Sequence, residues 1–112
     1  MSKTTLGLNE NIEGLLCYLV GAISGIVFFI LEKESEFVKF HAMQSIVTSL
    51  SLIVASMIVA VIPFVGILIS LLINLVSLAL WIFGMYKAYQ GERYKFPVFG
   101  DITEKLLKKI NI

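Results

Sequence analysis

The feature that most limits how this chain can fold is a stretch of 47 residues, Phe40 to Tyr86, without Asp, Glu, Lys or Arg. A helix that crosses a membrane needs about 20 largely apolar residues, because it rises about 1.5 Å per residue. The stretch is long enough for two crossings. It divides at "IPFVG", because Pro63 lacks a backbone donor and disfavours helix at the preceding residue. We predict spans at about 37–62 and 64–88.

A third apolar segment lies near the N-terminus. Residues 12–31, "IEGLLCYLVGAISGIVFFIL", contain one charge, Glu13, and are long enough to cross. A secretory signal peptide is the alternative, but its apolar core usually has about 7–15 residues and is followed by a small-residue cleavage site. Here the acidic sequence "EKESE" follows instead. We therefore predict a retained span, which brings the number of long transmembrane helices to three.

The composition agrees with lipid as the solvent. Charged residues make up 15% of the chain, against about 25% in soluble proteins, and the mean hydropathy is +0.92. A chain of 112 residues has too much surface for its volume to hide this apolar content from water. The net charge of +1 gives no reason to expect nucleic acid as a partner. We predict one all-α, multi-pass membrane domain over residues 1–112, in contact with the lipid bilayer.

Lys and Arg residues are distributed unequally between the two sides that three spans would create. The side with the N-terminus and the turn at Pro63 holds only Lys3, whereas the opposite side holds the other eight basic residues. Basic residues accumulate in short loops on the cytoplasmic side. We therefore predict a cell-membrane protein with its N-terminus outside and its C-terminus in the cytoplasm.

After Gly91 the sequence becomes a connector rich in glycine, proline and aromatic residues, followed by "DITEKLLKKINI". The apolar residues of the last segment fall on one helical face, which predicts a short amphipathic interfacial helix at about 101–111. Asp101 and Glu104 have the spacing of an N-terminal capping box. The helix either lies on the cytoplasmic leaflet or packs on the protein's own inner loop. The lysines expected near anionic lipid headgroups are Lys105, Lys108 and Lys109.

Small and polar residues recur at helical spacing in all three predicted spans. Membrane helices associate through such residues, because lipid is as apolar as leucine and gives no hydrophobic driving force. The candidate helix–helix contacts are Gly21 and Gly25 in the first span and Gly66, Ser70, Ser77 and Gly84 in the third. The candidate polar packing or partner site consists of His41, Gln44, Ser45, Thr48 and Asn74.

Two interpretations stay open for these polar residues. His41 and Gln44 are expected near the cytoplasmic end of the second span, where they either bond it to the inner ends of the other helices or contact a ligand or partner. Asn74 lies near the middle of the third span, where an unpaired amide costs several kcal/mol. It either bonds between helices or lines a substrate path.

The sequence lacks the side chains of a catalytic or metal site. It has one histidine and one cysteine, and the predicted topology keeps Cys17 and His41 at opposite ends of their spans. One histidine without a neighbouring thiol or carboxylate provides too few ligands for a metal. We predict no enzyme activity, no catalytic, metal or cofactor-binding residue and no cofactor.

Two segments resemble a widespread family of small prokaryotic membrane proteins. The first is "LNENIEGLLCYLVGAISGIVFFILEKESEFVKFHAMQSI", residues 8–46, with its F-H-A-x-Q-S motif, and the second is G-x-x-Y-K-F-P-x-x-G-D-I-x-E-K-L, residues 91–106. These proteins are grouped with the twenty-kilodalton component of the chloroplast inner-envelope import translocon in a Tic-like superfamily. The resemblance implies a helical membrane protein and points toward protein translocation or membrane-protein assembly. It implies no established activity.

We therefore expect a structural or interaction module that forms a homo-oligomer or joins other membrane proteins. The alternative is a minimal channel or transporter built from several copies, with Gln44 and Asn74 lining the path. A third hypothesis is a regulator that recognises lipid through the C-terminal lysines.

Overall fold

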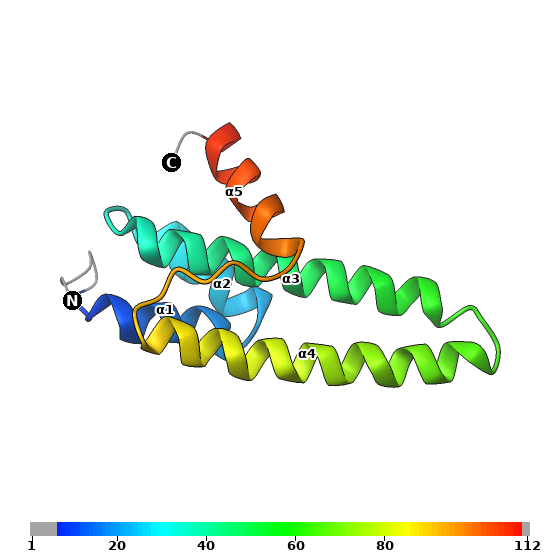
Figure 1. The fold of residues 1–112 in the computed structure, drawn as a ribbon. Helices are drawn as coiled ribbons and strands as arrows, with labels where there is room; N and C mark the ends of the chain where they lie inside the picture. Colours follow the sequence, from blue (N-terminus) through cyan, green and yellow to red (C-terminus); the bar gives the residue numbers. More distant parts are fainter. Residues whose placement is uncertain (1–6, 111–112) are drawn as a thin grey trace.

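The computed structural model describes residues 7–110, and this part of the chain is helical without a β-strand. The predicted all-α fold is confirmed for these residues. Figure 1 shows a long antiparallel hairpin with three shorter helices packed beside one half of it. The helices are α1 (Glu10–Leu19), α2 (Ala22–Leu31), α3 (Glu36–Val59), α4 (Val65–Tyr89) and α5 (Phe99–Ile110).

The hairpin consists of α3 and α4, which are long and apolar enough to cross a membrane. Their 24 and 25 residues rise about 36 and 37 Å, which exceeds a hydrocarbon core of about 30 Å. They correspond to the predicted spans at 37–62 and 64–88, separated by a turn at residues 60–64. We call the end where α3 begins and α4 ends the charged end, and the end with this turn the hairpin end.

The start of α3 is fixed by side chains of the acidic loop. The Ser35 hydroxyl accepts a hydrogen bond from the Val38 N–H, as an N-cap residue does. The Glu32 carboxylate accepts the backbone N–H groups of Glu34 and Ser35 at 3.0 and 2.9 Å. The bonds from the Ser35 and Val38 N–H groups satisfy backbone donors that the start of a helix leaves free, and the bond from the Glu34 N–H orders the loop before it.

The predicted crossing at residues 12–31 is wrong. This segment forms two helices of 10 residues, α1 and α2, with a break at Val20 and Gly21. Each helix rises about 15 Å, which is half of a hydrocarbon core. Gly21 has φ +60° and ψ −133°, a conformation that residues with a Cβ rarely adopt. The described residues therefore contain two candidate membrane spans, not three.

The break leaves backbone groups without helical partners, and serine hydroxyls satisfy them. Ser24 Oγ accepts from the Val20 N–H and donates to the Cys17 carbonyl, both at 3.0 Å. Ser45 Oγ, from α3, donates to the Gly21 carbonyl at 3.0 Å. Irregular backbone at membrane depth requires such partners, because lipid supplies none.

The two short helices form a re-entrant pair that begins and ends at the charged end. Asn11 Nδ2 donates to the Tyr89 carbonyl at 3.0 Å, and the Ser35 hydroxyl donates to the Glu10 carboxylate. The start of α1 therefore lies beside the end of α4 and the start of α3. The prediction of termini on opposite sides depended on three crossings, of which the structure supports two candidates. Lys3 lies outside the described residues.

The C-terminal helix α5 begins at Phe99, two residues before the predicted start, and residue 111 lies outside the described residues. Asp101 and Glu104 do not form the expected capping box. Their carboxylates accept hydrogen bonds from the Lys95 ammonium at 3.2 and 3.1 Å, and the bonds to Glu104 and Asp101 raise the pKa of Lys95.

One face of α5 packs on α3. Leu107 is buried in a cluster with Phe40, Met43 and Val47 of α3. Ile102 and Ile110 stay exposed on α5, at 39% and 50%. Part of the apolar face of α5, which predicted an interfacial helix, is therefore buried against α3.

Candidate functional site

His41 lies inside a buried hydrogen-bond network at the charged end of α3. Its Nδ1 is 2.6 Å from the Tyr18 hydroxyl, and its Nε2 is 2.9 Å from the Glu92 carbonyl. A carbonyl only accepts, so Nε2 carries a proton, and in the neutral ring Nδ1 accepts from the Tyr18 hydroxyl. Both nitrogens of the imidazole are therefore occupied by groups of the chain.

Gln44, one turn deeper on α3, uses every polar atom of its side chain. Nε2 donates to the Tyr18 hydroxyl at 2.9 Å and to the Tyr94 carbonyl at 3.0 Å. Oε1 accepts the backbone N–H of Phe96 at 2.9 Å. Gln44 is fully buried. It therefore ties the connector at residues 90–98, which has no regular structure, to both α3 and α1.

The F-H-A-x-Q-S motif and the second segment of the resemblance meet in this network. Phe40 is fully buried against α5 residues, and the guanidinium of Arg93 lies over its ring at 4.5 Å. Ser45, on the same face of α3, donates its hydroxyl to the Gly21 carbonyl at the break between α1 and α2. The motif thus joins three parts of the chain: the re-entrant pair, the connector and α5.

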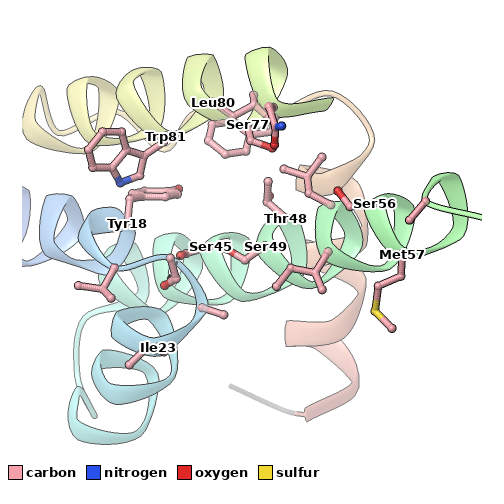
Figure 2. Close-up of a pocket in the computed structure, with 18 residues that line it drawn as sticks. Tyr18, Ile23, Ser45, Thr48, Ser49, Ser56, Met57, Ser77, Leu80 and Trp81 are labelled. Atoms are coloured by element: carbon pink, nitrogen blue, oxygen red, sulfur yellow. Dashed lines mark hydrogen bonds between the residues drawn. The ribbon is translucent and has the colours of Figure 1, made fainter. Parts of the chain in front are cut away.

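A cavity of about 710 Å³ lies deeper along the same helices. Its walls come from α3, α4 and the break between α1 and α2. Figure 2 shows Thr48 on α3 and Ser77 on α4 directed into the space between the helices, with Tyr18 and Trp81 together at one end. The polar side chains of the lining are Ser45, Thr48, Ser49, Ser56, Asn74 and Ser77.

Four of these polar side chains, Thr48, Ser49, Ser56 and Asn74, make no side-chain hydrogen bond within the described part of the chain. The Thr48 hydroxyl is buried and has no hydrogen-bond partner. Asn74 is exposed and lines the cavity. Ser77 instead donates to the Ile73 carbonyl at 2.7 Å, and Trp81 Nε1 donates to the Leu19 carbonyl at 3.3 Å.

The structure brings four of the five residues of the candidate polar site onto one face of α3. His41, Gln44 and Ser45 bond within the chain, whereas Thr48 faces the cavity. Asn74 lies apart from them, on the opposite wall.

The candidate helix–helix contacts lie at several different junctions. A Cβ on Gly25 would come within 2.9 Å of the Ala42 carbonyl, and one on Gly66 within 2.6 Å of the Val59 carbonyl. A Cβ on Gly84 would meet the Phe96 ring at 2.8 Å. Ser70 lines a small hollow next to the turn. Gly25, Gly66 and Gly84 allow the close approach of neighbouring groups, while Gly21 is required for its backbone conformation.

The three candidate lipid-contacting lysines, Lys105, Lys108 and Lys109, are exposed on α5. Lys108 also borders a small polar hollow shared with Lys39 and Arg93. The anionic-lipid contact stays a prediction.

Sequence reasoning missed the main partners of the motif. Tyr18 is 3% exposed and bonds to both His41 and Gln44, yet it lay in a segment interpreted as a plain span. The connector takes part through backbone atoms of Glu92, Tyr94 and Phe96, which no side-chain pattern reveals. The one available signal was that the resemblance covers the connector as well as the motif. Among the described residues, no group of three His, Cys, Asp or Glu could hold a metal ion.

Comparisons with known proteins identify the family. The sequence model of the magnetosome magnetite crystal formation protein family matches residues 5–103. The chain belongs to this family. No solved structure matches it.

Three archaeal relatives are similar over most of their length. A UPF0132 membrane protein of Methanocaldococcus jannaschii is 61% identical over 105 residues, which cover 94% of each chain. A second one from the same archaeon is 56% identical over 104 residues, covering 93% of this chain and 74% of the relative. A UPF0132 membrane protein of Archaeoglobus fulgidus is 46% identical over 98 residues, covering 88% and 95%.

These relatives, together with the two apolar helices, make the chain a membrane protein of a small archaeal family. The predicted membrane location and family type are confirmed at this level. The link to the chloroplast translocon and the role of the F-H-A-x-Q-S motif stay predictions.

Proposed function

We propose that this chain is a structural and interaction module of the membrane, without enzyme activity. The α3–α4 hairpin anchors it, and the His41–Gln44 network holds the C-terminal segment, residues 90–110, in a fixed place at the charged end. The supporting observation is that Gln44 uses both ends of its amide on this segment, at Tyr94 and Phe96. The segment would then present a basic surface to a second copy or to another membrane protein.

The distribution of charge supports an orientation in which this basic surface faces the cytoplasm. Arg93, Lys105, Lys108 and Lys109 are exposed on the C-terminal segment, whereas the turn at residues 60–64 carries no charge. Because basic residues favour the cytoplasmic side, we propose that the charged end and both termini face the cytoplasm. Cysteines introduced at Val61 and at Lys105 test this with a membrane-impermeant thiol reagent. Labelling of Val61→Cys in intact cells and of Lys105→Cys only after lysis is expected, and the opposite pattern would contradict it.

Site-specific photocrosslinking from Lys108 tests the interaction itself. A product of one defined mass is expected, either twice that of the chain or that of the chain plus one partner. Gln44→Leu should abolish the product because it releases the connector, while Ser51→Ala, on α3 but outside the network and cavity, should not. Adducts with lipid alone in every variant would refute the proposal. Adducts with unfinished polypeptides would support the implied role in translocation or membrane-protein assembly.

An oligomeric channel or transporter is the second candidate. It is supported by the polar side chains that line the α3–α4 cavity at membrane depth. Gln44 is occupied in the network, so the lining role would fall to Asn74 and Ser77. Proteoliposomes with wild-type protein should then pass ions or small solutes, and Asn74→Leu should reduce the flux. Absence of flux from both would end this candidate.

A further inference from the structure

A small hollow at the charged end has a charged lining. Its volume of about 120 Å³ is the space of about four water molecules, so it admits one small group. The start of α3, the connector and α5 all contribute to its walls. The lining residues are Glu36, Lys39, Arg93, Glu104, Leu107 and Lys108, and we call the space the basic hollow. Three segments that are distant in the sequence therefore bring three cations together.

The cations of the basic hollow are only partly neutralised within the chain. Among the ion pairs of the described residues, none includes Lys39 or Lys108. A nitrogen of the Arg93 guanidinium lies 3.9 Å from a Glu104 carboxylate oxygen, which is longer than a hydrogen bond. The other oxygen of Glu104 already accepts from the Lys95 ammonium at 3.1 Å. The donors of all three cations are therefore available to a further anion.

Two of the three cations are held in place by aromatic rings. The guanidinium of Arg93 lies 4.5 Å from the centre of the Phe40 ring, and the ammonium of Lys39 lies 5.2 Å from that of the Phe29 ring. Phe40 is fully buried and is a fixed support. A guanidinium on an aromatic face keeps its N–H donors free at its edge. Because these donors are positioned before a ligand arrives, less freedom is lost on binding.

The charge and depth of the basic hollow favour an anion from the membrane surface. Three cations face two carboxylates, Glu36 and Glu104, and the N-terminal end of α3 adds positive potential. One negative charge would complete the balance. Lys39 is the last charged residue before the 47 uncharged residues, so the hollow lies where α3 leaves the apolar layer. Basic pockets at this depth bind lipid headgroups, which present their phosphates there.

A lipid phosphate fits the basic hollow better than other anions. The cations come from different segments, which suits the tetrahedral oxygens of a phosphate more than a flat carboxylate. Leu107 adds an apolar wall, and exposed Ile110 follows three residues later on α5. Exposed Ile30 is the neighbour of Phe29, the ring that Lys39 contacts. These side chains offer a surface to acyl chains, which a soluble phosphate does not have.

We propose that the basic hollow binds the phosphodiester of one anionic phospholipid. Arg93 donates two hydrogen bonds to the phosphate oxygens, and the ammonium groups of Lys39 and Lys108 flank them. The bound lipid thereby joins α3, the connector and α5 at the membrane surface. The proposal requires a membrane location and no protein partner, so it can stand if the interaction module fails.

Native mass spectrometry of the full-length protein, released from detergent, tests the proposal with dioleoylphosphatidylglycerol as the probe. Wild type should retain one lipid molecule per chain. Lys39→Gln and Arg93→Lys should each weaken retention by about tenfold, the effect of one lost hydrogen bond to a charged group. Arg93→Lys keeps the charge and removes the flat guanidinium with its two parallel donors, so it separates a built site from general attraction.

The matched control is Lys33→Gln. It removes the same charge from an exposed side chain of the acidic loop, outside the hollow, and should bind like wild type. The side chains of Lys39 and Arg93 are half-buried and exposed, so their replacement leaves the core unchanged. Thermal unfolding in detergent should give the same midpoint for all three variants.

Two further probes separate the phosphate from the acyl chains and the lipid from a soluble ion. Dioleoylglycerol has the same chains without the phosphate and should not be retained. Glycerophosphoglycerol is the same headgroup without the chains and should not displace the lipid. Equal retention of dioleoylglycerol would assign binding to the chains alone, and displacement by glycerophosphoglycerol would assign the hollow to a soluble ligand. Either result would overturn the proposal.

The variants can overturn it as well. If Arg93→Lys binds like wild type while Lys39→Gln and Lys33→Gln weaken retention equally, net charge alone attracts the lipid. A loss in Lys105→Gln as large as that in Lys39→Gln would move the lipid to the exposed face of α5. No retained lipid in wild type would leave the basic hollow to another anion, such as an acidic side chain of a partner.

Discussion

The two halves of the α3–α4 hairpin are stabilised by different surroundings. At the charged end, the buried residues of α3 run from Val38 to Thr48 and include three polar side chains that bond to other parts of the chain. From Ser49 to Val59 no residue of α3 is buried, and the buried residues of α4 all lie near its two ends. One half therefore has a protein core with buried hydrogen bonds, and the other half has no such core within the chain.

The difference follows from the length of the re-entrant pair. Because α1 and α2 each rise only about 15 Å, they fill the space beside α3 and α4 only as far as Gly21. Beyond that point the hairpin is alone, and the cavity begins. Substitutions should therefore cost stability according to the half in which they fall.

The largest effect is expected from Gln44→Leu. The change leaves the Phe96 N–H and the Tyr94 carbonyl buried without their partner, and each unsatisfied group costs about 1–3 kcal/mol. We expect a loss of about 3 kcal/mol in the free energy of unfolding, measured by thermal unfolding in detergent. Asn74→Leu, an amide-to-leucine change in the other half, should cost nothing. Equal losses of stability in Gln44→Leu and Asn74→Leu would show that the two halves of the hairpin are stabilised alike.

A smaller loss is expected from Gly21→Ala, at the border between the halves. An added Cβ disfavours the backbone conformation at φ +60°, at a cost of about 2 kcal/mol. The strain acts on the break itself, so the re-entrant pair should loosen before the hairpin melts. Hydrogen exchange should show faster exchange in α1 and α2, with Ala22→Gly as a control next to the break. Unchanged exchange there would mean that the break does not depend on this conformation.

At the hairpin end, Gly66→Ala should lower the free energy of unfolding by about 1 kcal/mol. Its Cβ would meet the Val59 carbonyl at 2.6 Å, so the two helices must separate near the turn. Because little else packs at this end, the separation is absorbed locally. Thermal unfolding measures the loss, with Ile67→Ala as a control at an exposed neighbour. A loss as large as that of Gln44→Leu would show that the hairpin end has a core of its own.

The smallest effect is expected from Lys95→Met, on the surface of the charged end. The ion pairs of Lys95 with Asp101 and Glu104 are exposed, and exposed pairs contribute little. Their bonds raise the pKa of Lys95, so their contribution is present below the ordinary pKa of 10.5 and is lost as the pH rises through the raised value. Melting curves of wild type and Lys95→Met should nearly coincide at neutral pH and converge fully in alkaline buffer.

The sequence predicted what depends on length and periodicity, and missed what depends on backbone conformation and distant contacts. The 47 uncharged residues and Pro63 were enough for the hairpin. Residues 12–31 satisfied the same length rule, but a rule of apolar length does not register a glycine at positive φ. Gly21 was singled out for close packing, and its actual role is the break.

The candidate site was predicted in part for the same reason. Helical angles placed His41, Gln44, Ser45 and Thr48 on one face, and they do share one face of α3. Their partners could not be predicted, because Glu92, Tyr94 and Phe96 contribute backbone atoms about 50 residues away in the chain. Asn74 faces the cavity, whose existence depends on where the re-entrant pair ends.

The uncharged turn at residues 60–64 has a consequence for how this protein is made. If the charged end remains in the cytoplasm, the turn is the one described segment that must pass through the bilayer during insertion, and it carries no side chain that resists transfer. The α3–α4 hairpin can then enter as one unit, without moving a hydrophilic domain across. Since α1 and α2 are too short to cross alone, they would settle against α3 afterwards, although they are synthesised first. Synthesis and assembly would thus follow opposite orders in this chain.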